Sequence, residues 1–306
     1  MKFVKIAESM GIPIYADPKG FVSFFNSPYH AHRELRAIDI YSAERRYGKP
    51  GYSPVDGKVT YIRPFTPPEP RFFKGSSKDW IIALKSSSNP RLCVRILHLK
   101  PLVEVGEKVE VGDEIGVYLR TGHFDFWTDP HVHVEIRDPD NLVRARGGYR
   151  LTPIRETGDP RIVQDSPLEV SKVLENYILF RPKNGLCRAS GFWGLGCRVG
   201  ETFGILDGGI PHYGFGGVHL TKNAAKVGET VWLGKVKVGV VEEVFGETVR
   251  FKCTHIKLKV GERPMRGLSL YLNLNRNGEL KLIPQKPFLV DPGSIPSLSS
   301  ISLCNR

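Results

Sequence analysis

The sequence predicts an all-β protein made of two β-rich domains. The chain has 306 residues, and a domain prior of roughly 150 residues makes two domains the natural division. It also contains 32 Gly and 23 Pro, which separate many short apolar runs. Short apolar runs bounded by turn residues are typical of strands joined by tight connections. The chain length and the distribution of Gly and Pro together therefore favour two β-structured halves.

The first half contains a series of segments that we interpret as strands. Clusters of Pro, Gly and Ser separate them, which places turns between consecutive strands. The expected strands are Phe21–Phe25, Ala37–Tyr41, Lys58–Ile62, Trp80–Leu84, Leu92–Leu99, Glu114–Tyr118 and Val132–Arg137.

The segment that follows residue 150 has a different character. Ser166-Pro167-Leu168-Glu169 matches a capping box with Pro at the first helical position. Apolar residues then recur at helical spacing through Leu168–Leu179. We therefore predict one helix in a linker over residues 151–183. It would join a first domain over residues 1–150 to a second over 184–292, with a peripheral Ser/Pro-rich tail over 293–306.

The two halves share motifs in the same order, which indicates an internal duplication. His98-Leu99 is followed by a Gly-bounded loop that ends at Gly112, and His255-Ile256 is followed by a similar loop that ends at Gly267. Strand-like segments precede and follow both motifs. The second half is thus expected to repeat the fold of the first.

Charge and hydropathy narrow the class of partner. The formal net charge is +12, but the basic residues are scattered, so nucleic acid is an unlikely partner. No apolar stretch approaches the roughly 18 residues that a membrane span needs. The N-terminal apolar stretch is short and interrupted by charge, unlike a secretory signal. We expect a cytoplasmic protein without a membrane span. The sequence does not indicate an oligomeric state.

The cysteines point away from a thiolate metal site. There are five, and none forms a C-x-x-C pair. Cys187 and Cys197 bracket a Gly-rich loop. They are either bridged or present as buried free thiols.

The segment His131–Arg137 carries the clearest chemical signal. Polar and apolar residues alternate in it, so we predict a half-buried strand. His131 and His133 then leave the same face, roughly 6.5–7 Å apart along the strand. This spacing suits one metal ligand beside one acid/base group.

Three segments of the first half line up in an order that resembles a known family. The first runs from His32 to Asp39, and the second is His98-Leu99 with the Gly-bounded loop that follows. The third is Pro130 with His131–Arg137. Over about residues 28–142 the chain resembles the lysostaphin/LytM-type zinc metallopeptidases, which hydrolyse peptide cross-links such as those of bacterial cell walls.

The resemblance implies a fold, a cofactor and a set of site residues. The fold would be a β-sandwich or barrel of the duplicated-hybrid-motif type, repeated in degenerate form in the second half. Carried over by position, His32, Asp39 and His133 would bind zinc, and His98 and His131 would assist catalysis. Two imidazoles and one carboxylate leave the metal a fourth position for water. The implied substrate is a cross-linked or Gly-rich peptide, such as a peptidoglycan-like one.

Two departures from the family pattern leave alternatives open. The family spaces its first His and Asp four residues apart, but here Leu35 stands four before Asp39. His32 would need an expanded loop, His30 is the fallback, and the third alternative is no intact site. The second departure is the insertion Gly122–Asp129, either a rim that shapes substrate binding or an ordinary loop.

The second half is expected to lack a hydrolytic site. His219 stands where the first half has its aspartate, and His255 is the last histidine, so no H-x-H follows it. This half would be structural or would position substrate. For the whole chain, we hypothesise a zinc endopeptidase. The alternative is a catalytically inactive binding or scaffold module for peptide or glycan.

Overall fold

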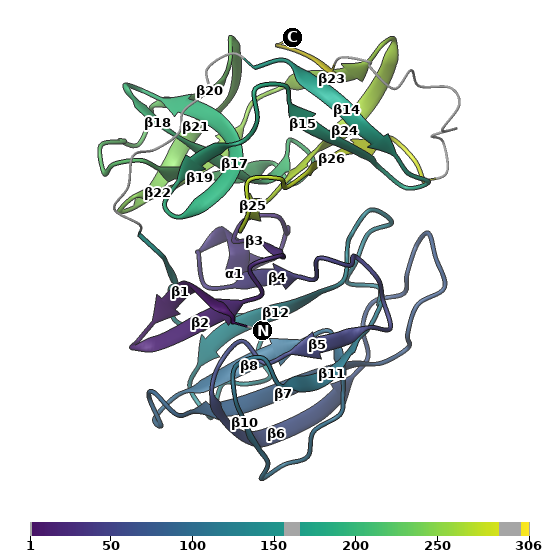
Figure 1. Cartoon of the computed structure of the whole chain (residues 1–306), viewed down its shortest axis with the longest axis vertical. Helices are drawn as coiled ribbons and strands as arrows, with labels where there is room; N and C mark the ends of the chain where they lie inside the picture. Colours follow the sequence, from purple (N-terminus) through teal and green to yellow (C-terminus); the bar gives the residue numbers. More distant parts are fainter. Residues whose placement is uncertain (1, 156–165, 288–300, 306) are drawn as a thin grey trace. The chain divides into compact units, whose positions relative to one another are not determined.

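The protein is almost entirely β-structure, which confirms the predicted fold class (Figure 1). The structure is a computed structural model and describes residues 2–155, 166–287 and 301–305. Within these ranges a single short α-helix, α1 (His30–Arg33), interrupts the strands. No helix in the described ranges is long and apolar enough to cross a membrane.

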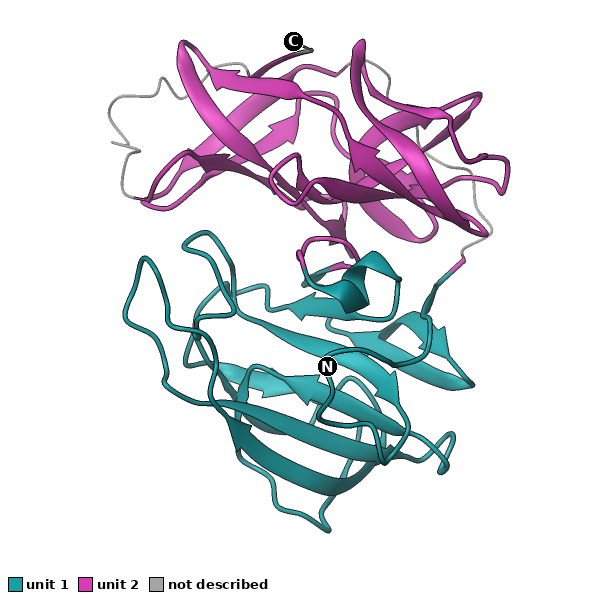
Figure 2. Cartoon of the chain, turned by 180° about the vertical axis from the view of Figure 1, so that it is seen from behind, with its two compact units in different colours: residues 1–22, 29–154 teal, residues 23–28, 155–306 magenta. Residues whose placement is uncertain are grey.

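The chain divides into two compact units that are not simply its two halves (Figure 2). Unit 1 contains residues 1–22 and 29–154, and unit 2 contains Ser23–Pro28 together with residues 155–306. The short segment Ser23–Pro28 is thus separated in sequence from the rest of its unit. Both units are β-rich, as predicted.

Unit 1 is built from short antiparallel strands. They are β1 (Val4–Ser9), β2 (Ile12–Ala16), β3 (Phe21–Ser23, whose last residue belongs to unit 2), β4 (Ile38–Tyr41), β5 (Pro50–Tyr52), β6 (Gly57–Phe65), β7 (Asp79–Ser86), β8 (Cys93–Leu97), β9 (Leu99–Pro101), β10 (Lys108–Val109), β11 (Glu114–Tyr118), β12 (His131–Arg137) and β13 (Thr152–Pro153).

The main sheet of unit 1 runs in the order β4-β12-β8-β7-β6-β10, with every pair antiparallel. One row of register partners crosses it: Ile82 opposes Ile96, Ile96 opposes Val134, and Val134 opposes Ile38. These four side chains are fully buried and form part of the core. Because successive residues of a strand face opposite sides, the neighbouring row must face the other side of the sheet.

Unit 2 is also antiparallel. Its strands are β14 (Leu168–Val173), β15 (Ile178–Pro182), β16 (Cys187–Ala189), β17 (Phe192–Val199), β18 (Thr202–Ile210), β19 (Phe215–Leu220), β20 (Thr230–Leu233), β21 (Val236–Phe245), β22 (Thr248–Cys253), β23 (Ile256–Val260), β24 (Arg263–Leu270), β25 (Leu272–Asn273), β26 (Leu280–Pro284) and β27 (Ile301–Asn305).

Of the segment Ser23–Pro28, all residues except Pro28 are buried, and the segment belongs to unit 2. Phe24 and Phe25 are fully buried, and their rings lie near the imidazole of His219 at centroid distances of 5.3 and 6.2 Å. A Cβ atom at Gly217 would come within 2.1 Å of the Phe25 ring. The absence of a side chain at Gly217 is therefore what makes room for Phe25.

The predicted helix over Leu168–Leu179 is wrong. This stretch forms β14 and β15, which pair with each other, and β15 also pairs with β26. Leu168, Val170 and Phe180 alternate into the core of unit 2. Short apolar runs fit the spacing of a helix as well as that of a strand. Here the pairing of the strands across the sheet determined the structure, in spite of the capping-box pattern at Ser166.

The predicted peripheral tail is also corrected where it is described. β27 pairs with β23 along its whole length, and Ile301 is buried in the core of unit 2. Residues 293–300 of that tail lie outside the described residues, as do 156–165 of the predicted linker.

Candidate metal centre

β12 is the strand around which the candidate site is built. It lies between β4 and β8, and His133 is the register partner of Asp39 on one side and of Leu97 on the other. All residues of β12 are buried, so the expectation of a half-buried strand is wrong. Val132, Val134 and Ile136 fill the core, while the polar face is buried under the site itself.

A tight turn at Leu35 brings His32 close to Asp39, although the two residues are seven apart in the sequence. After α1 the chain folds back at Leu35, where φ is +55°, and β4 starts at Ile38. A left-handed backbone costs a non-glycine residue roughly 1–2 kcal/mol, and burial of the Leu35 side chain offsets this cost. The turn brings the imidazole of His32 against the carboxylate of Asp39.

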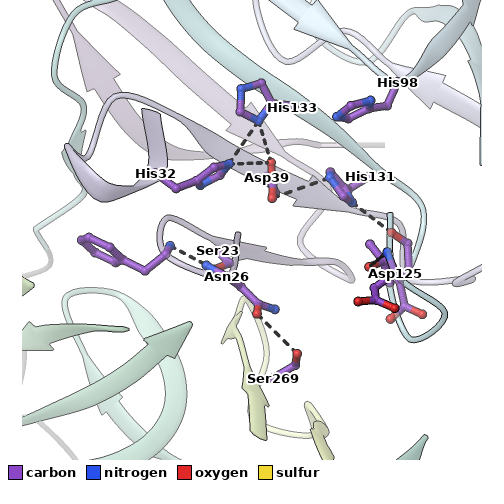
Figure 3. A network of polar contacts seen from close by, with 12 residues as sticks. Ser23, Asn26, His32, Asp39, His98, Asp125, His131, His133 and Ser269 are labelled. Carbon is purple, nitrogen blue, oxygen red and sulfur yellow. Dashed lines mark hydrogen bonds and ion pairs between the residues drawn. The ribbon is translucent and has the colours of Figure 1, made fainter. Parts of the chain in front are cut away.

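The ligating atoms of His32, Asp39 and His133 form a small triangle (Figure 3). His32 Nε2 lies 3.3 Å from Asp39 Oδ1 and 3.1 Å from His133 Nδ1, and His133 Nδ1 lies 3.0 Å from Asp39 Oδ1. Tetrahedral zinc with bonds of about 2.05 Å requires ligand atoms about 3.3 Å apart. The three atoms thus have the spacing of one face of a zinc tetrahedron.

The other candidate for the first ligand, His30, lies elsewhere. Its side chain is 42% exposed, and its Nε2 is 3.0 Å from Glu34 Oε1. In the described residues, His32, Asp39 and His133 are the one group of His, Cys, Asp or Glu side chains with metal-ligand spacing. The structure brings together the three residues expected to bind zinc.

Charges around Asp39 favour its ionised form. Burial raises the pKa of this carboxyl, but the charges of His32 and His131 and hydrogen bonds from His133 and His32 outweigh it. The pKa of Asp39 therefore stands well below its usual value. An ionised carboxylate with imidazole nitrogens around it is a suitable donor set for zinc.

Glu135 holds the far side of the His133 ring. Its Oε1 lies 2.8 Å from His133 Nε2, opposite the nitrogen that faces Asp39. Arg95 and Arg137 flank the carboxylate of Glu135. Burial raises the pKa of Glu135, but His133 and the two guanidinium groups lower it to about 2.

The bracketing of His133 by two carboxylates has a consequence for its proton. Burial lowers the pKa of His133, but hydrogen bonds and charges from Asp39 and Glu135 raise it to about 9. A metal ion at Nδ1 would take the place of one proton. Nε2–H would then remain bonded to Glu135, as is usual for a metal-ligating histidine.

The two histidines expected to assist catalysis lie beside the triangle. His131 Nε2 is 3.6 Å from Asp39 Oδ2, and its Nδ1 is 2.9 Å from the carbonyl oxygen of Asp129. The ring centroids of His98 and His131 are 5.4 Å apart. Burial lowers the pKa of His131 to about 4, in spite of the nearby Asp39.

His98 lies between β8 and β9 and is held by Asp79. Asp79 Oδ2 is 2.6 Å from His98 Nδ1, and Asp79 Oδ1 accepts the backbone N–H of His98 at 3.1 Å. Burial raises the pKa of Asp79, but the charge and hydrogen bond of His98 lower it overall. Sequence reasoning missed Asp79, the first residue of β7. It also gave Glu135 no role, although Glu135 lies in the alternating segment.

A cleft of about 460 Å³ opens onto this site. His98, His123 and His133 line it together with Tyr29, Phe65 and Arg95. His123 comes from the insertion Gly122–Asp129, and its Nδ1 is 3.2 Å from the Tyr29 hydroxyl. The insertion therefore contributes a wall of the cleft, while Trp127 at its other end is packed against Phe126.

His219, which stands in the sequence where the first half has Asp39, has different neighbours in unit 2. His219 Nε2 is 3.3 Å from Asp207 Oδ2, and His219 Nδ1 is 3.3 Å from the Thr248 hydroxyl. Asp207 also accepts the backbone N–H of Phe24 at 2.7 Å and the hydroxyl of Ser23. His255 is exposed. No group with metal-ligand spacing occurs in the described part of this unit.

Cys187 and Cys197 are not bridged. Both are buried free thiols, and burial raises the pKa of Cys197 well above its usual value. Cys197 is part of the hydrophobic core of unit 2.

Two family models match the chain. One is described as "Domain of unknown function (DUF8155) N-terminal domain" and matches residues 15–153; the other is described as the C-terminal domain of DUF8155 and matches residues 161–292. The chain belongs to the DUF8155 family. Neither description assigns an activity, and no curated protein matches this DUF8155 chain.

Solved structures similar to this DUF8155 chain include forms of one antimicrobial peptidase. The catalytic domain of lysostaphin from Staphylococcus simulans, crystallized without phosphate, has 20% identity and a TM-score of 0.25 over 39% of this chain and 86% of that one. Lysostaphin from the same organism has 15% identity and a TM-score of 0.26 over 93% and 96%. Scores this low carry no argument about function, which rests on the site residues.

Proposed function

We propose that the protein is a zinc-dependent endopeptidase that hydrolyses a peptide bond in a cross-linked or Gly-rich peptide. The single observation that carries the proposal is the triangle of His32 Nε2, Asp39 Oδ1 and His133 Nδ1, whose edges measure 3.0 to 3.3 Å. These are the edges that a tetrahedral zinc ion requires. Glu135 supports the site by fixing the orientation of His133.

Zinc, when bound to these residues, would polarise the scissile carbonyl and lower the pKa of a water molecule. The chain itself supplies two imidazoles next to that position. Because Nδ1 of His131 faces the carbonyl oxygen of Asp129, it carries the proton, and Nε2 is left as an acceptor. One imidazole with such a lone pair can take a proton from the attacking water and return it to the leaving amine, while the second orients the water by accepting a hydrogen bond from it.

The lining of the cleft suits a substrate that offers mainly apolar or neutral surface. This lining is mostly apolar, with Tyr29 and Phe65 on the walls of the cleft and histidines where it reaches the site. Arg95 and Glu135 compensate each other's charge there, and the other charged side chain of the lining is Arg63. A substrate without charged side chains near the scissile bond, such as a Gly-rich peptide, suits this lining.

The test is metal analysis combined with hydrolysis, on the full chain purified without added metal. We expect about one zinc per chain, lost to a chelator and regained on adding zinc. A fluorogenic oligoglycine peptide and isolated peptidoglycan serve as probes, and both should be cleaved only by the zinc-loaded protein. His131→Ala should abolish cleavage while zinc is retained.

Two results would count against the proposal in different ways. No zinc in the purified or reconstituted protein, with unchanged melting in His133→Ala, would remove the metal centre. Zinc at full occupancy without cleavage of either probe, but with peptidoglycan binding that His98→Ala leaves intact, would instead favour the inactive binding module.

A further inference from the structure

His98 is held in a backbone conformation that it would not adopt by itself. Its φ is +75°, in the left-handed region that non-glycine residues rarely occupy. Such a residue persists only when its surroundings over-determine it, and strain of this kind gathers at functional sites. Contacts to the backbone and to the ring of His98 hold it in this conformation.

Asp79 makes both contacts. One carboxylate oxygen, Oδ1, accepts the backbone N–H of His98 at 3.1 Å and that of Trp80 at 2.7 Å. The other, Oδ2, is 2.6 Å from His98 Nδ1, and the Thr121 hydroxyl approaches it at 3.4 Å. Asp79 is fully buried. A single carboxylate therefore fixes the backbone of His98 and the direction of its ring.

The same contact fixes the tautomer. A carboxylate only accepts, so Nδ1 must carry the proton that it shares with Asp79, and Nε2 is left with a free lone pair. His131 has the same tautomer, but its Nδ1 faces the neutral carbonyl oxygen of Asp129, and the carboxylate 3.6 Å from its Nε2 is that of Asp39, which belongs to the proposed metal site. When an imidazole takes up a second proton in a buried site, a carboxylate partner compensates the new charge and a carbonyl does so only weakly.

We propose that Asp79 is a positioning residue that makes His98, rather than His131, the imidazole that carries the proton during hydrolysis. His98 Nε2 takes a proton from the attacking water while the water oxygen bonds to the scissile carbon. It returns the proton to the amine nitrogen as the carbon–nitrogen bond breaks. This inference rests on the proposed peptidase function.

Asp79→Asn tests this role directly, because the hydrogen bonds at this position determine the orientation of the new amide group. Two backbone N–H groups already donate to Oδ1, so the amide oxygen has to take that place and the NH₂ group faces His98 Nδ1. Nδ1 must then accept, and the proton moves to Nε2. The substitution preserves shape but reverses the tautomer of His98.

The readout is the long-range proton–nitrogen NMR spectrum of the zinc-loaded full chain labelled with ¹⁵N-histidine. The His98 signals are assigned by their loss in His98→Gln. We expect Nδ1–H in the wild type and in the control Asp113→Asn, which changes an exposed carboxylate in the same way. In Asp79→Asn we expect Nε2–H and a loss of oligoglycine cleavage of about 10²-fold to 10⁴-fold, at unchanged zinc content.

The wild-type spectrum alone can overturn the inference, even if Asp79→Asn fails to fold. A wild-type His98 protonated on Nε2 would overturn it. So would an Asp79→Asn protein that reverses the tautomer yet cleaves within about twofold of Asp113→Asn. If no variant or wild type cleaves any probe, the proposed function fails, while the tautomer result still decides whether Asp79 positions His98.

Discussion

Each unit contains a buried aspartate beside a buried histidine, but the remaining contacts of the two carboxylates differ. In unit 1 Asp39 is surrounded by the imidazoles of His32, His131 and His133. In unit 2 Asp207 meets His219 together with donors from the chain's own Ser23 and Phe24. An imidazole can exchange its proton for a metal, whereas a backbone N–H cannot. The neighbours of the carboxylate therefore distinguish a candidate metal centre from a structural anchor.

The largest expected difference between the two units is in zinc binding after one histidine is removed from each. His133→Ala deletes a zinc ligand and should reduce zinc affinity by about 10³-fold or more, because two ligands remain. His219→Ala should leave zinc content at the wild-type level. Elemental analysis of both variants, purified identically, measures their zinc content. Equal zinc in the two variants would show that the triangle does not hold the metal.

The second test removes the carboxylate of the structural anchor. Asp207→Ala leaves the N–H of Phe24, the hydroxyl of Ser23 and His219 without their acceptor in a buried place. We expect the free energy of unfolding to fall by on the order of 3 kcal/mol, with zinc content unchanged. Glu201→Ala, at an exposed turn of the same unit, is the control and should change stability by less than about 0.5 kcal/mol. Equal denaturation midpoints for the two variants would contradict the anchor.

A third test compares the groups that orient the two histidines. Glu135→Gln keeps an acceptor for His133 Nε2–H but removes the charge that Arg95 and Arg137 compensate. Zinc affinity should fall about 10-fold to 100-fold, as for other groups that orient a metal-ligating histidine. Thr248→Val removes the orienting hydroxyl of His219 and should leave zinc affinity unchanged. Competition with a chromophoric chelator measures both, and an unaffected Glu135→Gln would remove Glu135 from the centre.

The fourth test concerns pH, and its expected effect is about tenfold for each pH unit. The pKa of His133 in the metal-free protein is raised to about 9, so below that pH zinc must displace a proton. Apparent zinc affinity should rise about tenfold per pH unit up to about pH 9 and then level off. Conversely, protonation of His133 stabilises the metal-free fold at low pH, and this contribution is lost as the pH rises from 6.5 through about 9. A flat affinity profile over this range would contradict the bracketing of His133 by two carboxylates.

Much of the fold was accessible from local pattern. The alternation in His131–Arg137 predicted the central strand, and Gly and Pro punctuation predicted the strands around it. Burial of both faces of that strand could not be predicted, because it depends on β4 and β8, which are distant in sequence. The stretch Leu168–Leu179 was misassigned for a related reason: its strand partner β26 lies about a hundred residues away.

The candidate site shows the same division. The H-x-H motif identified His131 and His133, but the proximity of His32 to Asp39 depends on the left-handed turn at Leu35, which no residue type announces. Asp79 was missed because nothing near it in sequence marks it, and its partner His98 lies 19 residues further on. Whether the assembled residues bind zinc and hydrolyse peptides stays a prediction.

The membership of Ser23–Pro28 in unit 2 affects how this protein can be dissected and how it can have evolved. A plasmid that encodes only residues 155–306 omits Phe25, whose ring occupies the space beside Gly217. It also omits Phe24, whose backbone N–H donates a hydrogen bond to Asp207. The complementary fragment carries Phe24 and Phe25 without the interior that covers them. Recombination at a single breakpoint could not have transferred either unit intact. A synthetic peptide spanning Ser23–Pro28, added in trans, is the natural complement for a truncated gene product.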